Sequence, residues 1–343
     1  MRIGILTADA GYEEWRARTG GADLLEHGMQ RLERTVGAVR AVLEEDGHSV
    51  LTFPVNRGLF ASLVESRPPL VFNTYFGPAR RQDQAHVASL LEYAGVPSTS
   101  GDAACHFLGL SKPLSKRIFS ASALPTPGFF IVTRTSETDR SLEISGLPFP
   151  LIVKASAEGE GIGIDERSVV RTRGELLDAV ARIVRGLDQP ALVEEFLPGR
   201  EFTVGVLDGE SPRVLPILEI VLGVGQTYSW QAKTGETTKD ICPAALSVPE
   251  AELMGGLAVR AGRMLGCRDY WRADFRQDSR GAPHLLEVNT LPGLQPGYSD
   301  MTKMAGPAGI DYAEMVRTIM ESARRRCEPT FSGESGSSPR APR

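Results

Sequence analysis

Two neighbouring stretches decide the fold: Tyr270-Trp271-Arg272-Ala273-Asp274-Phe275 and His284-Leu285-Leu286-Glu287-Val288-Asn289. In each stretch polar and apolar residues alternate, which is the period of a half-buried β-strand. The intervening Asp278-Ser279-Arg280-Gly281 supplies turn residues, so we expect a β-hairpin. We expect Asp278 to pair with Pro283 across this turn.

The same register brings charged side chains together. It places Asp274 opposite Glu287 and Arg272 opposite Asn289, all on one face of the hairpin. Opposed Cβ atoms lie about 5 Å apart, where two carboxylates repel unless one is protonated or a cation lies between them. Carboxylates and an amide oxygen are ligands that Mg²⁺ accepts beside phosphates. The hairpin therefore predicts a metal site, with a solvated strand face as the alternative.

A second informative stretch runs from Pro150 to Gly163. Lys154 follows the apolar residues Leu151–Val153, which predict a strand. Three glycines, Gly159, Gly161 and Gly163, then alternate with other residues. Such glycines permit close approach of the backbone to a ligand. Because an extended segment follows instead of a helix, neither a P-loop nor a dinucleotide fingerprint is present. The stretch predicts a flap whose amides cover phosphates, with an unliganded glycine-rich hairpin as the alternative.

Composition excludes several classes of protein. The 343 residues are too many for one ordinary domain, and 38 basic against 43 acidic residues leave a net charge of −5. This balance gives no electrostatic footprint for nucleic acid or an anionic membrane. The four cysteines form no C-x-x-C pair, and the N-terminus has no signal-peptide pattern. We expect a cytoplasmic enzyme with free thiols, without a nucleic acid or membrane partner.

The first 100 residues alternate strands with helices. We expect helices over Asp23–Glu45 and Asp83–Tyr93, and this alternation is typical of a parallel sheet. No G-x-G-x-x-G follows the first strand, which disfavours a nicotinamide-binding dehydrogenase. The predicted strands are Arg2–Leu6, Ser49–Pro54, Leu70–Asn73 and Val96–Thr99.

We divide the chain into three domains and a tail. The first covers residues 1–100, a central unit covers 101–190, and a third unit covers 191–327. Residues 328–343 are rich in Ser, Pro and Gly, and we expect them to be disordered.

Taken together, the hairpin and the glycine-rich stretch resemble the ATP-grasp fold, and within it the D-alanine–D-alanine ligase family. The resemblance implies an α/β (α+β) fold with an N-terminal Rossmann-like parallel sheet, a central lid domain and a C-terminal domain that grips ATP with the lid. Further matching segments follow along most of the chain: Val71-Phe72-Asn73, Leu110-Ser111-Lys112, Leu124-Pro125-Thr126-Pro127, Leu192–Leu197, Gly199–Val204, Ala232-Lys233, Ile241–Ala244 and Leu286–Gly293.

The resemblance also implies which residues bind ATP. Lys112 and Lys154 match two lysines that contact the phosphates, and Glu201 matches a carboxylate that takes the ribose hydroxyls. Residues Glu194 to Leu197 match the hinge that reads the adenine, and Lys233 matches a loop lysine on the transferred phosphate. The full implied set is Lys112, Lys154, Glu158, Gly159, Gly161, Glu194, Glu195, Phe196, Leu197, Glu201 and Lys233.

The implied chemistry begins with phosphoryl transfer from ATP to a carboxylate, which gives an acyl phosphate. An amine then displaces phosphate and forms an amide. Asp274, Glu287 and Asn289 match the ligands of two Mg²⁺ ions, which Mn²⁺ is able to replace. Arg272 and the Gly293 amide match the groups that stabilise the oxyanion, and Lys233 completes the catalytic set. The sequence has no G-x-S-x-G motif for a nucleophilic serine.

Departures from the family gather on the substrate side. A long loop follows the first strand, where Glu13, Glu14 and Glu26 are candidates to hold the ammonium group of the first substrate. The remaining departures are Phe76 before Gly77, Arg80 and Arg81, Glu160 in the flap, and Tyr298 with Ser299. The long first loop and Arg80 with Arg81 predict a first substrate that is larger or more acidic than D-alanine, whereas Tyr298 or Ser299, in the loop for the second substrate, is a candidate to bind a carboxylate.

Two other functions stay open at this point. One is a true D-alanine–D-alanine ligase of cell-wall synthesis with a remodelled loop. The other is a nucleotide-binding sensor without catalysis, although a pure binder has no need of Arg272. The substrates of a ligase would be a carboxylic acid and an amine, and the family resemblance favours a homodimer.

Overall fold

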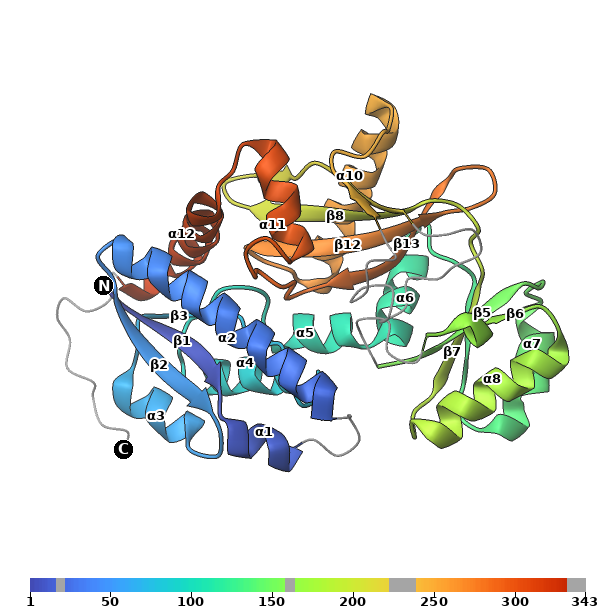
Figure 1. The fold of residues 1–343 in the computed structure, drawn as a ribbon, viewed down its shortest axis with the longest axis horizontal. Helices are drawn as coiled ribbons and strands as arrows, with labels where there is room; N and C mark the ends of the chain where they lie inside the picture. Colours follow the sequence, from blue (N-terminus) through green and yellow to red (C-terminus); the bar gives the residue numbers. More distant parts are fainter. Residues whose placement is uncertain (17–21, 158–163, 222–238, 332–343) are drawn as a thin grey trace, which may run out of the picture.

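The computed structural model describes residues 1–16, 22–157, 164–221 and 239–331. Its N-terminal part holds the parallel sheet β2-β1-β3, with α2 and α4 packed beside it (Figure 1). Val96–Thr99 contributes only one parallel bridge, between Val71 and Ser98, and is not a full strand. The elements are β1 (Arg2–Ala8), α1 (Ala10–Arg16), α2 (Ala22–Glu45), β2 (Ser49–Val55), α3 (Leu59–Ser66), β3 (Leu70–Phe72) and α4 (Asp83–Tyr93).

The lid is a four-stranded antiparallel sheet of order β4-β7-β5-β6, covered by α7 and α8. Because β7 pairs with both β4 and β5, the domain boundary predicted at 190/191 falls inside this sheet. The elements are β4 (Phe129–Val132), η1 (Thr135–Glu137), α7 (Thr138–Ser145), β5 (Leu151–Ala155), η2 (Glu166–Ser168), β6 (Val169–Val170), α8 (Arg173–Gly186) and β7 (Ala191–Glu195).

The C-terminal part is built on a second antiparallel sheet, of order β11-β10-β8-β12-β13, with β9 beside β8. The last helix reaches Phe331 and so includes the first four residues of the segment predicted to be disordered, whose remaining residues lie outside the described part of the chain. The elements are β8 (Glu201–Asp208), β9 (Pro212–Val214), β10 (Leu218–Val221), β11 (Lys239–Ile241), α10 (Val248–Leu265), β12 (Tyr270–Gln277), β13 (Pro283–Asn289), α11 (Asp300–Ala305), η3 (Gly306–Ala308) and α12 (Tyr312–Phe331).

The N-terminal and C-terminal parts share an apolar core, whereas the lid has a separate one. One core runs from the N-terminal sheet into α11 and α12, for example from Phe72 to Met304. A second core fills the space between the large sheet, α10, and the helices α5 (Ala103–Leu110) and α6 (Lys112–Ala121). The lid has a core of its own. Residues 103–121, predicted to belong to the central unit, therefore pack with the C-terminal sheet.

The predicted hairpin is present, but its register changes along its length. Asp274 pairs with Glu287 as predicted, whereas Gln277, and not Asp278, pairs with Pro283. A β-bulge between Asp274 and Phe275 accounts for the difference, because it gives β13 one extra residue. None of the described helices combines the length and the apolar character that crossing a membrane requires.

Candidate active site

One face of β12 carries the charged residues of the site. Arg272, Asp274 and Arg276 alternate along the strand, so their side chains project from the same side. The neighbouring strand β8 places Thr203 opposite Asp274 and Glu201 opposite Arg276. The unbroken register of β12 with β8 therefore fixes these groups relative to one another.

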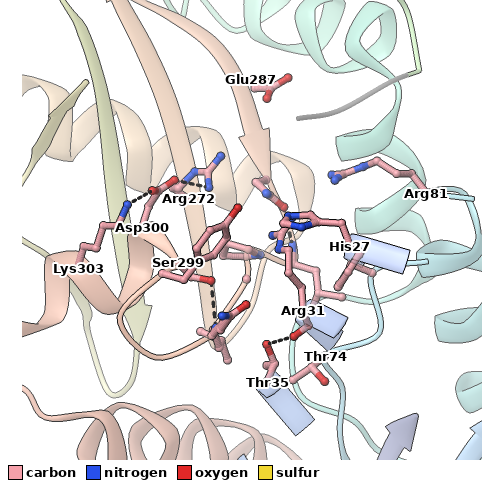
Figure 2. A pocket seen from close by; sticks show the side chains of 18 residues that line it. His27, Arg31, Thr35, Thr74, Arg81, Arg272, Glu287, Ser299, Asp300 and Lys303 are labelled. Carbon is pink, nitrogen blue, oxygen red and sulfur yellow. Dashed lines mark hydrogen bonds and ion pairs between the residues drawn. The ribbon is translucent and has the colours of Figure 1, made fainter. Parts of the chain in front are cut away.

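Arg272 is the centre of an ion-pair network. Its Nε and Nη2 each donate to a carboxylate oxygen of Asp274 at 2.9 Å. Its Nη1 donates to Asp300 Oδ2 at 2.8 Å (Figure 2). Asp274 also accepts a hydrogen bond from the Thr203 hydroxyl. This bidentate geometry orients the guanidinium group at the edge of a cavity.

The donor set of the predicted metal site fits Mg²⁺. Asp274 and Glu287 face each other across the hairpin, Glu287 binds Lys112 Nζ, and Asn289 lies two residues beyond Glu287. Among the residues that the structure describes, no group of three or more His, Cys, Asp or Glu is placed to hold a metal. Mg²⁺ ordinarily takes one or two carboxylates and fills its shell with phosphates and water, which is what two carboxylates and an amide oxygen offer.

Two cavities meet at this hairpin. The larger, of about 120 Å³, is bounded by the N-terminal helix α2, the end of β13 and the loop before α11 (Figure 2). The smaller, of about 20 Å³, is bounded by Lys112 and Ala157. Arg81, Glu287 and Asn289 line both. Glu287 and Asn289 of the predicted metal site therefore stand between a lysine-lined side and a second, wider side.

A buried trio of charges lies on the lysine-lined side. Glu194 Oε1 is 2.5 Å from Lys116 Nζ, and Glu194 Oε2 is 2.8 Å from Lys154 Nζ. Burial opposes ionisation of Glu194, but the two ammonium groups lower the pKa of its carboxyl to about 2. Burial likewise opposes the charge on Lys154, yet Glu194 raises the pKa of that ammonium group, whereas for Lys116 burial prevails and lowers the pKa.

The sequence analysis did not identify Lys116. The available signal was its spacing, because Lys112 and Lys116 lie four residues apart on α6 and so share a helix face.

The hinge residues that were predicted to read adenine follow directly after the lid. Glu195 ends β7, the Phe196 N–H donates to the Pro150 carbonyl at 3.1 Å, and Leu197 is buried. Glu201 accepts a hydrogen bond of 3.0 Å from Arg276, whose guanidinium lies 5.3 Å from the centre of the Phe196 ring. Arg276, like Lys116, was not predicted from the sequence to belong to the site. Glu158, Gly159, Glu160, Gly161 and Lys233 lie outside the described residues.

The loop after β13 approaches the larger cavity closely. A Cβ atom added to Gly293 would lie 2.8 Å from Ser299 Oγ, so a side chain at this position would displace its neighbour. Ser299 Oγ itself accepts a hydrogen bond of 3.0 Å from the Gln295 N–H. Gly293, Tyr298 and Ser299 all line the cavity, so the predicted oxyanion glycine and the predicted substrate loop lie together.

A polar cluster supports this loop from behind. His106 Nδ1 lies 2.8 Å from Thr290 Oγ1 and 2.9 Å from Gln84 Nε2, and Thr290 directly follows Asn289. Burial lowers the pKa of His106 to about 4, so the imidazole is neutral near neutral pH. The cluster ties α4 and α5 to the end of β13.

The N-terminal wall of the cavity differs from the prediction. Phe76 and Arg81 line it, but Arg80, Glu13, Glu14 and Glu26 are not among the described lining residues. Glu13 is fully buried elsewhere, where its carboxylate accepts hydrogen bonds from the Tyr75 hydroxyl and, at 3.1 Å, from the Ala79 N–H. Each of its oxygens thus accepts one hydrogen bond inside the N-terminal part, and the role of Glu13 as a ligand of a substrate ammonium group stays a prediction.

The wall is formed instead by residues that the sequence analysis did not name. His27 and Arg31 of α2 line the cavity and point toward the loop after β13 (Figure 2). They lie four residues apart and so share one face of the helix, and this spacing is the only feature of the sequence that connects them. The long loop before α2 has no secure alignment with the shorter loop of the family, so no motif connected these two residues with the site.

Comparisons with known proteins agree with this geometry. Residues 118–321 match the family model described as "D-ala D-ala ligase C-terminus". An uncharacterised protein of Sinorhizobium fredii is 34% identical over 85% of this chain and 88% of its own length. A D-alanine–D-alanine ligase of Moorella thermoacetica is 33% identical over 83% of this chain and 92% of its own.

The fold is likewise that of solved ligases. The structure of a D-alanine–D-alanine ligase of Bacillus anthracis complexed with ATP superposes with a TM-score of 0.74, at 22% identity, over 96% of this chain and 99% of that one. The arrangement of sheets is thus the ATP-grasp fold. Fold, family model and relatives converge on one assignment: the chain belongs to the D-alanine–D-alanine ligase family of ATP-dependent ligases.

Proposed function

We propose that this protein joins a carboxylic acid to an amine through an acyl phosphate, and that its preferred substrates are not two molecules of D-alanine. The observation that carries the proposal is the meeting of Arg272, Gly293 and Glu287 at the larger cavity, while Glu287 also lines the smaller cavity beside Lys112 and pairs with Asp274 across the hairpin. Family membership supplies the reaction class, and the residues of the cavity wall supply the argument about substrates.

In the proposed reaction a substrate carboxylate oxygen attacks the terminal phosphorus of ATP, and ADP leaves. The amine nitrogen then attacks the acyl carbon, phosphate leaves, and the nitrogen gives up a proton. Mg²⁺ held by Asp274, Glu287 and Asn289 supplies positive charge to the phosphates when bound. Arg272 and the Gly293 N–H are proposed to stabilise the oxyanion of the tetrahedral intermediate, a contribution whose loss typically costs about 10²–10³ in rate.

Lys112 and Lys154 are proposed to contact the phosphates, and Glu194, Glu195, Phe196 and Leu197 to surround the adenine. The ion pairs of Lys112 with Glu287 and of Lys154 with Glu194 support this, because they hold the two ammonium groups beside the smaller cavity and the hinge. Glu201 is proposed to bind the ribose hydroxyls, with Arg276 as the group that orients it.

The argument about substrates comes from the N-terminal wall. A ligase of α-amino acids gains from a carboxylate that holds the ammonium group of its first substrate. Of the described residues that line the larger cavity, only Glu287 and Asp300 are acidic, and both bind cations of the protein. Because neither carboxylate is left for an ammonium group, we propose that other residues of the cavity wall contact the substrates, namely Phe76, Arg81, Tyr298 and Ser299.

The test is phosphate release from ATP and Mg²⁺ with D- and L-amino acids and dicarboxylic acids, offered singly and in pairs, with products identified by mass. Turnover with a pair other than two D-alanines, at higher kcat/KM than D-alanine, is the expected result. D-alanine as the best donor and acceptor would overturn the substrate part alone. No phosphate release with any pair would overturn the proposed function.

Three further proposals rest on the family resemblance: two Mg²⁺ ions, a homodimer and a cytoplasmic location. Asp274→Asn and Glu287→Gln should each remove Mg²⁺-dependent ATP use and leave a folded protein. Activity retained in both variants would reject the metal assignment. Light scattering after gel filtration determines the number of subunits, and fractionation of the native cell determines the location.

A further inference from the structure

We propose that His106 of α5 and Gln84 of α4 are positioning residues for the metal site. They hold Thr290 and, through it, keep the Asn289 side chain in the orientation that binds Mg²⁺. This inference rests on the proposed function, and it adds two residues that no motif connects with the reaction.

Three buried side chains form a closed cluster behind Asn289. His106 Nδ1 lies 2.8 Å from Thr290 Oγ1 and 2.9 Å from Gln84 Nε2, and Gln84 Nε2 donates to Thr290 Oγ1 at 3.1 Å. His106 is 0% exposed, Gln84 is 1% exposed and Thr290 is 2% exposed. A side chain that leaves such a cluster gives up hydrogen bonds that water does not replace, so each member restrains the other two.

The hydrogens of the cluster are assigned from its partners. A carboxamide nitrogen only donates, so His106 Nδ1 accepts from Gln84, and Nε2 carries the hydrogen of the neutral imidazole. Ser100 Oγ lies 3.3 Å from this Nε2 and accepts that hydrogen bond. The Thr290 hydroxyl accepts from Gln84 and donates to Nδ1. His106 therefore offers Thr290 an acceptor in a fixed place.

The close packing of α5 restrains the Thr290 side chain from a second direction. A Cβ atom added to Gly109, three residues after His106, would lie 2.5 Å from Thr290 Cγ2 and 3.2 Å from Thr290 Oγ1. Helix α5 comes this close only because Gly109 has no side chain. Both branches of the Thr290 side chain thus contact one face of α5, and rotation about its Cα–Cβ bond is blocked.

Thr290 transmits this restraint to Asn289. Asn289 Oδ1 accepts a hydrogen bond of 3.2 Å from the Leu291 N–H, which closes a turn whose middle residue is Thr290. A carboxamide oxygen has two lone pairs, so Oδ1 keeps one for a metal. Asn289 and Thr290 both line the smaller cavity. The turn and the cluster together therefore decide where the second lone pair of Asn289 points.

The cluster also ties this metal ligand to the N-terminal part. Gln84 belongs to α4, whose Val87 and Leu91 are part of the apolar core of the N-terminal sheet. The orientation of Asn289 thus depends on α4 and α5 as well as on the hairpin. The loss of a group that orients a metal ligand from behind typically weakens metal binding about 10- to 100-fold.

The test measures metal binding directly. Mn²⁺ is titrated into the protein in the presence of a non-hydrolysable ATP analogue, and electron paramagnetic resonance measures the free Mn²⁺. A titration of the analogue alone gives the Mn²⁺ that the nucleotide itself holds. We expect His106→Gln to raise the Mn²⁺ concentration at half-saturation about 10-fold, at the lower end of that range, because Thr290 stands between His106 and the ligand.

His106→Asn is the matched variant that should rescue binding. Its shorter side chain places a carboxamide where Nδ1 lies, whereas His106→Gln places one where Nε2 lies, so only the first offers Thr290 an acceptor. We expect His106→Asn to stay within about threefold of wild type in Mn²⁺ affinity. Thr290→Val removes the hydroxyl and should match His106→Gln. The double variant should bind no more weakly than either single variant, because both changes break the same contact.

Kinetics separate this role from a structural one. His106→Gln should raise the Mg²⁺ concentration for half-maximal turnover about 10-fold, and leave kcat at saturating Mg²⁺ and KM for ATP within about threefold. His86→Gln is the surface control, because His86 is an exposed residue of α4. Val87→Ala is the control for lost packing, because Val87 is 2% exposed in the N-terminal core. Both controls should leave the Mn²⁺ and Mg²⁺ dependence unchanged.

If His106→Gln lowers stability but binds Mn²⁺ as Val87→Ala does, the cluster is only structural and the inference is overturned, while the ligase assignment stands. Equal losses of Mn²⁺ affinity in His106→Gln and His106→Asn would also overturn it. If His106→Gln does not fold, Thr290→Val decides the question by the same measurement. Wild-type protein that holds no more Mn²⁺ than the analogue alone would instead overturn the metal assignment of the proposed function, on which the inference rests.

Discussion

The two sides of the site are built by different means. On the nucleotide side, strands of two sheets and helix α6 bring together charges that pair with one another, as in Lys116–Glu194–Lys154. On the substrate side, α2 and two loops surround a cavity in which a cation stacks on aromatic rings and polar atoms lack partners. The described ion pairs of the Lys116–Glu194–Lys154 trio thus satisfy one another, whereas at the larger cavity Thr74 Oγ1, Gln295 Oε1 and His27 Nε2 are buried without a hydrogen-bond partner.

This difference indicates on which side of the site the protein tolerates the replacement of a residue. A residue of the nucleotide side is held by strand pairing and by a buried partner, so its replacement disturbs the fold as well as binding. A residue of the substrate wall is held by packing against rings, and its replacement changes mainly which molecule fits. Replacements on each side, and of Arg272 where the two sides meet, test that division.

Replacement of Arg272 should have the largest effect. It touches both sides, through Asp274 and through Asp300. We expect Arg272→Gln to lower kcat about 10²–10³-fold while nucleotide affinity stays within about threefold, because its proposed role arises only in the transition state. Steady-state kinetics and calorimetry check this. Unchanged turnover would show that the meeting point of the two sides is not catalytic.

Lys116→Met tests the nucleotide side by stability. Lys116 is 1% exposed, and its loss leaves the buried carboxylate of Glu194 with Lys154 alone. Removing one partner of a buried ion pair costs about 3–5 kcal/mol, which denaturant unfolding measures. Lys239→Met removes an exposed lysine as a control. A loss equal to that of the control would mean that the trio contributes little to the fold.

The pH dependence of stability tests the cluster behind Asn289. The pKa of His106 is about 4 in the fold against 6.5 when unfolded, so the unfolded chain binds more protons between these values. The contribution of His106 is complete above pH 6.5 and is lost as the pH falls to about 4, by roughly 3 kcal/mol. The difference in unfolding free energy between wild type and His106→Gln should show this slope. A difference that does not vary with pH over that range contradicts the shift.

Glu13→Gln should have the smallest effect and distinguishes fold from substrate binding. Glu13 accepts two hydrogen bonds within the N-terminal part, so we expect a stability loss of about 1–3 kcal/mol with KM for both substrates unchanged. Glu14→Gln, at an exposed neighbour, should change neither quantity. A raised KM in the folded Glu13 variant would restore its predicted role as an ammonium ligand.

Much of this architecture was predictable because its signals are periodic. The sequence placed α2 at Asp23–Glu45 and α4 at Asp83–Tyr93, and the structure has Ala22–Glu45 and Asp83–Tyr93. The pairing of Asp274 with Glu287 followed from strand alternation. These features depend on local spacing, which a single sequence contains.

The substrate wall was not predictable in the same way. The direction of the Glu13 side chain depends on a hydrogen bond from Tyr75, 62 residues away, which no local pattern contains. His27 and Arg31 lie on an ordinary amphipathic helix, and only the packing of α2 against a distant loop brings them to the cavity. The pairing of β7, which follows the predicted boundary at 190/191, likewise involves strands that precede it by many residues.

The bulge in β13 has a consequence for the way this hairpin tolerates insertions. Leu285 and Val288 are both buried in the core although they lie three residues apart, and Glu287 and Asn289 remain on the opposite side. At the bulge, β13 has one residue more than β12. The alternation of its side chains between the two faces of the sheet is therefore shifted by one residue between the turn and Glu287. The exposed tip at Ser279–Gly281 is therefore separated from the metal face, and a peptide tag grafted there offers a reporter that leaves the chemistry undisturbed.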